Sequence, residues 1–184
     1  MKRQTSITYG ENVTYFVTTT ITEFTHIFQI KELAQIVLDN IKFYQDKFDV
    51  LIHGFVIMPN HIHLLLTMTD KGNISQFMGQ MKEYSAKQII EWCEKNNKDD
   101  FLRIFLNSAK RYRPDHSYQV WQARFDDVVI SSKNVFDVKL EYIHNNPLQD
   151  RWRLVEKPDD YDFSNAEFYF SGGDCSLDIM VSCE

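Results

Sequence analysis

Two apolar, strand-forming runs separated by only two residues constrain this chain most strongly. Val50–Met58 and His61–Met68 are rich in β-branched and large apolar residues, which favour strands. Between them stand Pro59 and Asn60, which are both common in turns. Strands joined by so short a connection pair as an antiparallel hairpin, because parallel pairing needs a much longer crossover. We therefore predict an antiparallel sheet around this hairpin.

The segments on either side of the hairpin predict a mixture of strands and helices. Apolar residues recur at spacings of three and four over Ile30–Phe48, as in amphipathic helices. The other elements predicted are the strand Val13–Thr22, the helix Ile74–Glu94, a short helix Phe101–Ala109, the extended segment Val120–Ile130 and the helix Val135–Asn146. This order predicts an α+β fold with an antiparallel sheet and helices packed mainly on one face, related to the ferredoxin-like arrangement.

Charge is uneven along the chain, although the net charge is only −6. Residues 1–157 hold all 20 Lys and Arg together with 19 of the 26 Asp and Glu, so this part is nearly neutral. Residues 158–184 hold seven acids and no base. We expect one domain over residues 1–157, followed by an acidic C-terminal tail, residues 158–184, that is partly packed.

The composition also narrows the class of protein. No run of eighteen apolar residues occurs, and the amino-terminal region lacks the pattern of a secretory signal. The cysteines, Cys93, Cys175 and Cys183, are scattered and form no CxxC pair, which argues against a disulfide framework or a zinc ribbon. We expect a cytoplasmic protein with no membrane partner.

The segment from Phe101 to Phe125 is basic and aromatic. Asp115 is its only acid, against five cations. The cations are Arg103, Lys110, Arg111, Arg113 and Arg124. The aromatic residues between and beside them are Tyr112, Tyr118, Trp121 and Phe125. Such a segment can hold a single nucleic-acid strand, with bases on the rings and phosphates on the cations. A solvated loop beside an ordinary core tryptophan explains the same pattern, and the sequence leaves both readings open.

A histidine pair on the second hairpin strand is the sharpest local motif. His61 and His63 flank one apolar residue, Ile62. Side chains alternate along a strand, so the two imidazoles project to the same side about 6.6 Å apart along the backbone. Two imidazoles so placed can bind one metal ion, although buried histidines with hydrogen-bond partners are also common.

The last predicted helix carries a possible nucleophile. Tyr142 and Asn146 stand four residues apart, so they lie on one helical face. A tyrosine hydroxyl can act as a nucleophile when a nearby cation or base assists it, and an asparagine oxygen can bind a hard cation. Taken alone, a tyrosine on an amphipathic helix is usually a core or rim residue.

Taken together, these motifs resemble the REP-associated tyrosine transposases of the single-tyrosine HUH superfamily. In that superfamily, two histidines flanking a hydrophobic residue bind a metal, and a helix carries the nucleophilic tyrosine. The resemblance extends from about Val13 to Tyr169. The matching blocks are Met58-Pro59-Asn60-His61-Ile62-His63, Trp121-Gln122 with Phe125-Asp126 and Val129-Ile130, and Tyr142-Ile143 with Asn145-Asn146-Pro147.

The resemblance implies a function and a role for each matching residue. Tyr142 would be the nucleophile, and His61, His63 and Asn146 would be the metal ligands. The reaction would nick and rejoin single-stranded DNA through a 5′-phosphotyrosine intermediate, with the ferredoxin-like fold of HUH transposases. An oxygen ligand and no thiolate favour Mg²⁺ or Mn²⁺, with zinc a lesser alternative. The implied partners are single-stranded or hairpin DNA and a second copy of the chain in a homodimer.

Two other functions remain open at this point. A domesticated, catalytically silent relative would bind hairpin DNA as a regulator or structural module. A metal-dependent nuclease would use the same histidine pair with water in place of Tyr142.

Three further residues near these motifs receive different expectations. His144 stands about 200° round the helix from Tyr142, so we expect it to face elsewhere. His53, on the first hairpin strand, is expected in the core or behind the metal ligands rather than as a ligand itself. Lys139 could touch a DNA phosphate, but solvated surface is the expected position.

Overall fold

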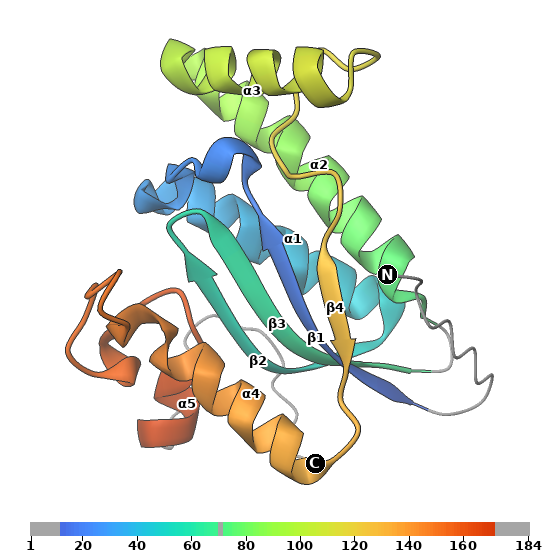
Figure 1. Ribbon diagram of the computed structural model, residues 1–184, viewed down its shortest axis with the longest axis vertical. Coiled ribbons are helices and arrows are strands. Elements are labelled where there is room, and N and C mark those ends of the chain that lie inside the picture. Colours follow the sequence, from blue (N-terminus) through green and yellow to red (C-terminus); the bar gives the residue numbers. More distant parts are fainter. Residues whose placement is uncertain (1–11, 70–71, 172–184) are drawn as a thin grey trace.

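The computed structural model describes residues 12–69 and 72–171. Its centre is a sheet of four antiparallel strands in the order β2-β3-β1-β4 (Figure 1). The strands are β1 (Val13–Thr20), β2 (Val50–Met58), β3 (His61–Met68) and β4 (Asp126–Val129). The predicted α+β fold with an antiparallel sheet and a tight hairpin is therefore confirmed, and both hairpin strands have the predicted bounds.

The helices lie on both faces of this sheet. The larger core packs one face against α1 (Lys31–Phe48) and α2 (Ile74–Lys95). The opposite face carries a smaller cluster under α4 (Lys133–Asn145), with α5 (Ala166–Ser171) beside it (Figure 1). Short 3-10 turns connect these elements, η1 (Thr22–Phe24), η2 (Ile27–Gln29), η3 (Asn146–Leu148) and η4 (Pro158–Asp160). None of the described helices has the length and apolarity needed to cross a membrane.

A bulge in β2 decides which of its side chains face each helical layer. The register with β3 shifts between Ile52 and Gly54, so that His53 is an extra residue between two paired positions. The extra residue reverses the alternation, because Ile52 and Phe55 both belong to the larger core whereas Val56 belongs to the smaller cluster. The sequence did not predict this bulge.

The basic segment differs from the predicted layout in two ways. Its helix α3 runs over Asp99–Tyr112, longer than expected, while β4 takes only four residues of the extended segment. Trp121 is buried in the larger core, and its indole nitrogen donates to Ser85 Oγ at 3.0 Å. The core reading was therefore correct for Trp121, whereas Tyr112 is exposed.

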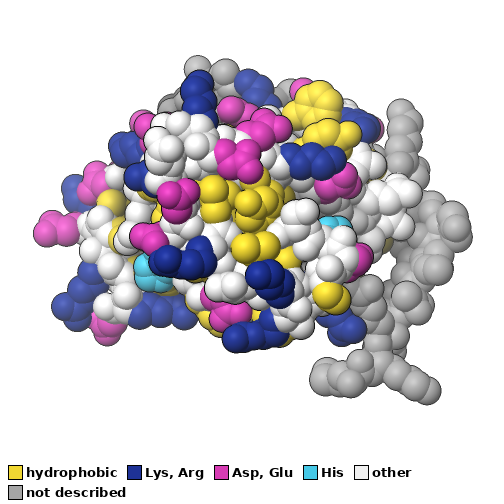
Figure 2. Space-filling model, turned by 90° about the horizontal axis from the view of Figure 1, so that it is seen from above, with side chains coloured by type: hydrophobic (Ala, Val, Ile, Leu, Met, Phe, Trp, Pro, Cys, Tyr) yellow, Lys and Arg dark blue, Asp and Glu magenta, His cyan; other side chains and the backbone are white. Residues whose placement is uncertain are grey.

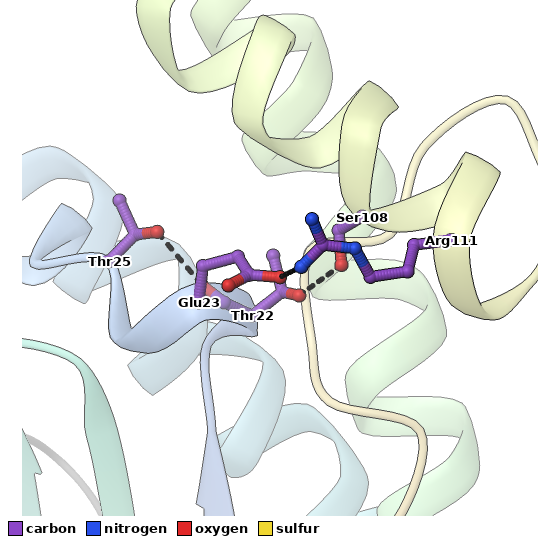
Figure 3. Close-up of polar contacts among 5 residues, drawn as sticks. All are labelled: Thr22, Glu23, Thr25, Ser108 and Arg111. Carbon is purple, nitrogen blue, oxygen red and sulfur yellow. Dashed lines mark hydrogen bonds and ion pairs between the residues drawn. The ribbon is translucent and has the colours of Figure 1, made fainter.

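Two cations of this segment form ion pairs with nearby acids. Arg111 pairs with Glu23 of η1 at 3.5 Å, and Arg103 pairs with Asp100 at 2.6 Å. The hydroxyls of Thr22 and Ser108 also form a hydrogen bond, so η1 and α3 are joined by side chains (Figure 3). Figure 2 shows the face of the molecule seen from above, where basic and acidic side chains alternate around exposed apolar ones. The basic composition of the segment therefore does not produce an unbroken basic surface on this face.

The first part of the acidic tail packs along the outer edge of β2. The backbone N–H of Ile57 donates to Phe163 O at 2.8 Å, and the Tyr161 hydroxyl donates to Ile57 O at 2.8 Å. The amide of Asn165 donates to His53 O at 2.9 Å and accepts from the N–H of Phe55 at 3.0 Å. These bonds cover an edge that would otherwise expose unpaired backbone groups.

Asn165→Ala tests this edge contact. We expect the free energy of unfolding to fall by about 2–4 kcal/mol, because the buried N–H of Phe55 and the buried carbonyl of His53 both lose a partner. Urea denaturation monitored by circular dichroism measures the change. Asn134→Ala, at an exposed position of α4, is the matched control. Equal stability of the two variants would contradict the role given to Asn165.

Candidate active site

The histidine pair lies on the face of β3 that α4 covers. His61 and His63 are 8% and 4% exposed, and their ring centroids lie 4.7 Å apart. The Nδ1–H of His61 donates to Asn60 Oδ1 at 2.7 Å, and the Asn60 amide in turn donates to the carbonyl of Phe24 at 3.0 Å. That second bond fixes which end of the Asn60 amide accepts, so Nε2 of His61 carries the free lone pair.

The second imidazole is held in a similar way. Thr18 stands directly opposite His63 in the sheet, and its hydroxyl lies 2.8 Å from His63 Nδ1. When that hydroxyl accepts from Nδ1–H, Nε2 of His63 carries a lone pair, and this buried atom has no hydrogen-bond partner among the described residues. Partners at Nδ1 are the usual means by which proteins orient a metal-binding histidine. Sequence reasoning missed Thr18 and Asn60 as partners of the histidines. Thr18 lies on β1, outside the hairpin, so no local pattern indicates its contact with His63.

Both imidazoles are neutral at pH 7. Burial, with smaller contributions from the charges of Arg151 and His26, lowers the pKa of His61 to about 4. Burial also lowers the pKa of His63 to about 3, with contributions from His61, Arg151 and Lys139. A neutral imidazole keeps the lone pair that metal coordination needs, so the site can bind a cation without first losing protons.

Helix α4 brings Tyr142 beside this pair. The Tyr142 ring is half-buried, with its centroid 5.2 Å from that of His63 and 5.9 Å from that of Phe16. The tyrosine and the histidines therefore meet within a single chain. Tyr142, His61 and His63 were predicted from the sequence to share a site, and the structure brings their rings together.

A glycine in β2 allows α4 to lie this close to the sheet. A Cβ at Gly54 would stand 2.6 Å from Leu140 Cδ1 and 3.4 Å from Ile143 Cδ1. Ile143 is fully buried in the smaller cluster. Because Leu140 and Ile143 fix the underside of the helix, Tyr142 lies at its margin, facing the histidines.

Asn146 follows α4 at the first position of η3 and is fully buried. Its backbone is still helical, so it lies one turn beyond Tyr142. Neither its Oδ1 nor its Nδ2 has a hydrogen-bond partner among the described residues. Burying an amide without partners costs free energy, so such a group marks a place where an ion or ligand can supply the missing interaction.

Each of the three ligands predicted from the sequence offers a donor atom that suits a divalent cation. Two imidazole nitrogens with free lone pairs and one unpaired amide oxygen are available from His61, His63 and Asn146. Within the described parts of the chain, there is no group of three or more His, Cys, Asp or Glu side chains that could hold a metal ion. An amide oxygen in the set suits Mg²⁺ or Mn²⁺.

Trp152 closes the side of the site next to His61. Its ring centroid lies 5.8 Å from that of His61 and 5.5 Å from that of His26. The buried indole nitrogen has no partner among the described residues, and the guanidinium of Arg151 lies over the ring at 5.6 Å. Sequence reasoning missed this residue, because nothing in its local pattern separates it from an ordinary surface tryptophan.

His144 and His53 make their hydrogen bonds outside the histidine pair. His144 faces the tail, where its Nε2 lies 3.2 Å from Asn165 Oδ1, and burial lowers its pKa to about 4. His53 is buried with Nε2 2.7 Å from the Thr67 hydroxyl. Lys139, by contrast, is half-buried rather than fully solvated, with Nζ 4.4 Å from the centroid of the Phe16 ring.

A known protein family and solved structures match this chain in sequence and in fold. Residues 11–146 match the family described as "Transposase IS200 like". Among solved structures, the chain is similar to a REP-associated tyrosine transposase bound to a REP hairpin, with a TM-score of 0.66 and 18% identity. That similarity covers 97% of this chain and 88% of the other.

A weaker similarity links the chain to a putative transposase from Deinococcus radiodurans, with a TM-score of 0.43 and 19% identity over 79% of this chain and 97% of the other. No curated protein sequence matches this chain. At 18% identity, the similarity to the REP-associated tyrosine transposase establishes the fold alone.

The lowered pKa values predict a loss of stability in mild acid. The unfolded chain takes up protons on its histidines as pH falls below about 6.5, whereas the pKa values of folded His61, His63 and His144 are about 4, 3 and 4. The free energy of unfolding therefore has its full value above pH 6.5 and falls at lower pH. We expect a loss of at least about 2 kcal/mol between pH 7.5 and 5.5, measured by urea denaturation with chelator present.

Two variants separate this effect from a general sensitivity to acid. His144→Gln should reduce the loss by about a third, because one of the three groups no longer titrates in the unfolded chain. His116→Gln, which removes an exposed imidazole, is the control. Identical unfolding free energies at the two pH values would contradict this account.

Proposed function

This chain belongs to the family of IS200-like transposases, and from that premise we propose that it nicks and rejoins single-stranded DNA through Tyr142 with a divalent cation. The observation that carries the proposal is the tyrosine ring 5.2 Å from a buried, neutral histidine pair. We propose Tyr142 as the nucleophile and His61, His63 and Asn146 as the cation ligands.

The proposed chemistry needs little beyond these side chains. The Tyr142 oxygen loses its proton to solvent and forms a bond to the phosphorus of the scissile phosphate. The bond from that phosphorus to the 3′ oxygen breaks, and this oxygen takes up a proton from solvent. The strand then carries a 3′-hydroxyl and a 5′-phosphotyrosine link, and the reverse attack restores the strand. Mg²⁺ or Mn²⁺ held by the three ligands would polarise the phosphate and offset charge on its oxygens.

The meeting of Tyr142 and the histidines within one chain supports a site that is complete in each molecule. A homodimer is then not required to bring the nucleophile to the histidines. The backbone between Tyr142 and Asn146 is helical without interruption, so the nucleophile and the proposed oxygen ligand are held in a fixed relation.

We propose single-stranded or hairpin DNA, met in the cytoplasm, as the substrate. A solved structure with the same fold is described as bound to a REP hairpin. Two cations, Lys139 and Arg151, lie close enough to the histidine pair to lower the pKa of His63. Positive charge on both α4 and the loop that follows it suits a site that must receive a phosphodiester.

Tyr142→Phe tests the nucleophile. Wild-type protein incubated with labelled hairpin DNA and Mn²⁺ should form an adduct that survives a denaturing gel, and this band should disappear with chelator. Tyr142→Phe should form no adduct, because the ring remains but the attacking oxygen is gone. Tyr84→Phe, on the exposed surface of α2, is the matched control and should react normally.

Other outcomes of the same gel identify the alternatives. An adduct with Tyr142→Phe would exclude Tyr142 as the nucleophile. Cleavage without any adduct would favour a water-dependent nuclease, and binding in a native gel without cleavage would favour a silent hairpin-binding protein.

Asn146→Leu tests the proposed oxygen ligand, because it should weaken metal binding and stabilise the metal-free protein. Mn²⁺ binding, measured by titration with electron paramagnetic resonance, should weaken at least about tenfold, since even outer-sphere partners of metal ligands are worth that much. The metal-free protein should become more stable by about 1 kcal/mol, because two buried polar atoms without partners are removed.

Asn134→Leu, on the exposed part of the same helix, is the control and should change neither quantity. Unchanged Mn²⁺ affinity in Asn146→Leu would exclude Asn146 as a ligand.

A further inference from the structure

Helix α4 carries a second reactive side chain on the face that holds Tyr142. Lys139 precedes Tyr142 by three residues, so the two lie on neighbouring positions of one helical face. Its Nζ stands 5.8 Å from the centroid of the Tyr142 ring and 4.4 Å from that of the Phe16 ring. Both rings border His63. The ammonium group therefore lies beside two aromatic rings that both contact His63.

The surroundings of Lys139 leave its hydrogen-bond donors available. Within residues 12–69 and 72–171, no carboxylate forms an ion pair with it. Lys133 on the same helix differs, because its Nζ lies 2.8 Å and 2.9 Å from the two carboxylate oxygens of Asp137. Aromatic faces attract an ammonium group without using its N–H donors in directed bonds. Lys139 is thus held in place while it remains able to bind an anion.

The Lys139 ammonium stands on the tyrosine side of the site. Arg151, the other cation whose charge reaches His63, lies over Trp152, whose ring borders His61. An anion placed between Tyr142 and the histidine pair would meet Lys139 on the side where the phenol oxygen approaches. A phosphodiester in that position presents two non-bridging oxygens, which are strong acceptors for an ammonium group.

We propose that Lys139 is a further catalytic residue, which donates hydrogen bonds to a non-bridging oxygen of the scissile phosphate while Tyr142 attacks it. This inference rests on the proposed function of Tyr142. Lys139 forms no covalent bond and keeps its proton. Negative charge on the phosphoryl oxygens increases as the new bond forms, so a fixed cation stabilises the transition state more than the ground state. Phe16 supports the lysine in the required position.

Lys139→Met tests this role, because methionine keeps the apolar stem over Phe16 and removes the charge. Two quantities are compared, the single-turnover rate of adduct formation at saturating hairpin DNA and Mn²⁺, and the Kd for the same DNA in a native gel with chelator. We expect the rate to fall about 100-fold or more, the usual effect of losing one such donor, while the Kd changes less than about threefold.

Matched variants complete the test. Lys133→Met removes a lysine from the same helix, and its rate and Kd should stay within about twofold of wild type, since that cation is exposed and already paired. Lys139→Arg keeps the charge and should react faster than Lys139→Met. Thermal unfolding by circular dichroism should be similar for all three variants. A Mn²⁺ titration of Lys139→Met should match wild type, which separates the lysine from the cation ligands.

Several results would overturn the inference. A rate for Lys139→Met within about threefold of wild type would do so, because a lost phosphate donor costs far more. A defect that disappears at saturating DNA would reduce Lys139 to a binding contact, and a lost Mn²⁺ affinity would assign it to the cation site. If the wild-type protein itself forms no adduct, the proposed function is overturned and this inference with it. If wild type and Lys139→Met both form the adduct at the same rate, only the inference is overturned.

Discussion

Strand β3 lies between two layers of helices, and all of its residues are buried. Its alternation therefore separates two environments, because Leu64 and Leu66 enter the larger core whereas His61 and His63 face α4. A slip of one residue in the hairpin would bury both imidazoles among the aliphatic side chains of α1 and α2. The two-residue turn and the burial of both faces exclude that slip, so the position of the site follows from the packing of one strand.

The packing of α4 against β2 determines which side chains contact the histidines. The absence of a side chain at Gly54 lets Leu140 and Ile143 approach β2 closely, and this contact sets both the height and the rotation of α4. Tyr142 and Lys139 then lie along the same margin of the helix, beside Phe16 and His63. The helical backbone continues into Asn146, so one rigid element carries three of the side chains to which we give a chemical role.

The parts that local sequence could predict are those governed by short-range periodicity. The hairpin bounds were correct because turn residues and apolar runs specify them directly, and the HxH and tyrosine motifs were informative because strand and helix periods fix which side chains share a face. The extended segment Val120–Ile130 forms a shorter strand than its length suggested. Lys82 of α2 donates to the carbonyls of Gln122 and Arg124, and beyond β4 the pairing continues as an isolated bridge between Ile21 and Trp121. Three other features depend on contacts between residues far apart in sequence, which no local pattern indicates. They are the bulge at His53, the Nδ1 partner of His63 and the packing of the tail along β2.

The polar groups of the site lower the stability of the isolated fold. Two imidazoles are held neutral by burial, and Asn146 buries an amide without a partner. An all-aliphatic cluster under α4 would avoid both costs, and the adjacent residues Val56, Met58 and Leu65 show that this face accepts such residues. Interactions that destabilise a metal-free fold yet leave two nitrogens and one oxygen unpaired are characteristic of a site selected for binding rather than for packing. The same reasoning applies to Lys139, because a half-buried cation beside two aromatic rings gains its full interaction energy only when an anion joins it.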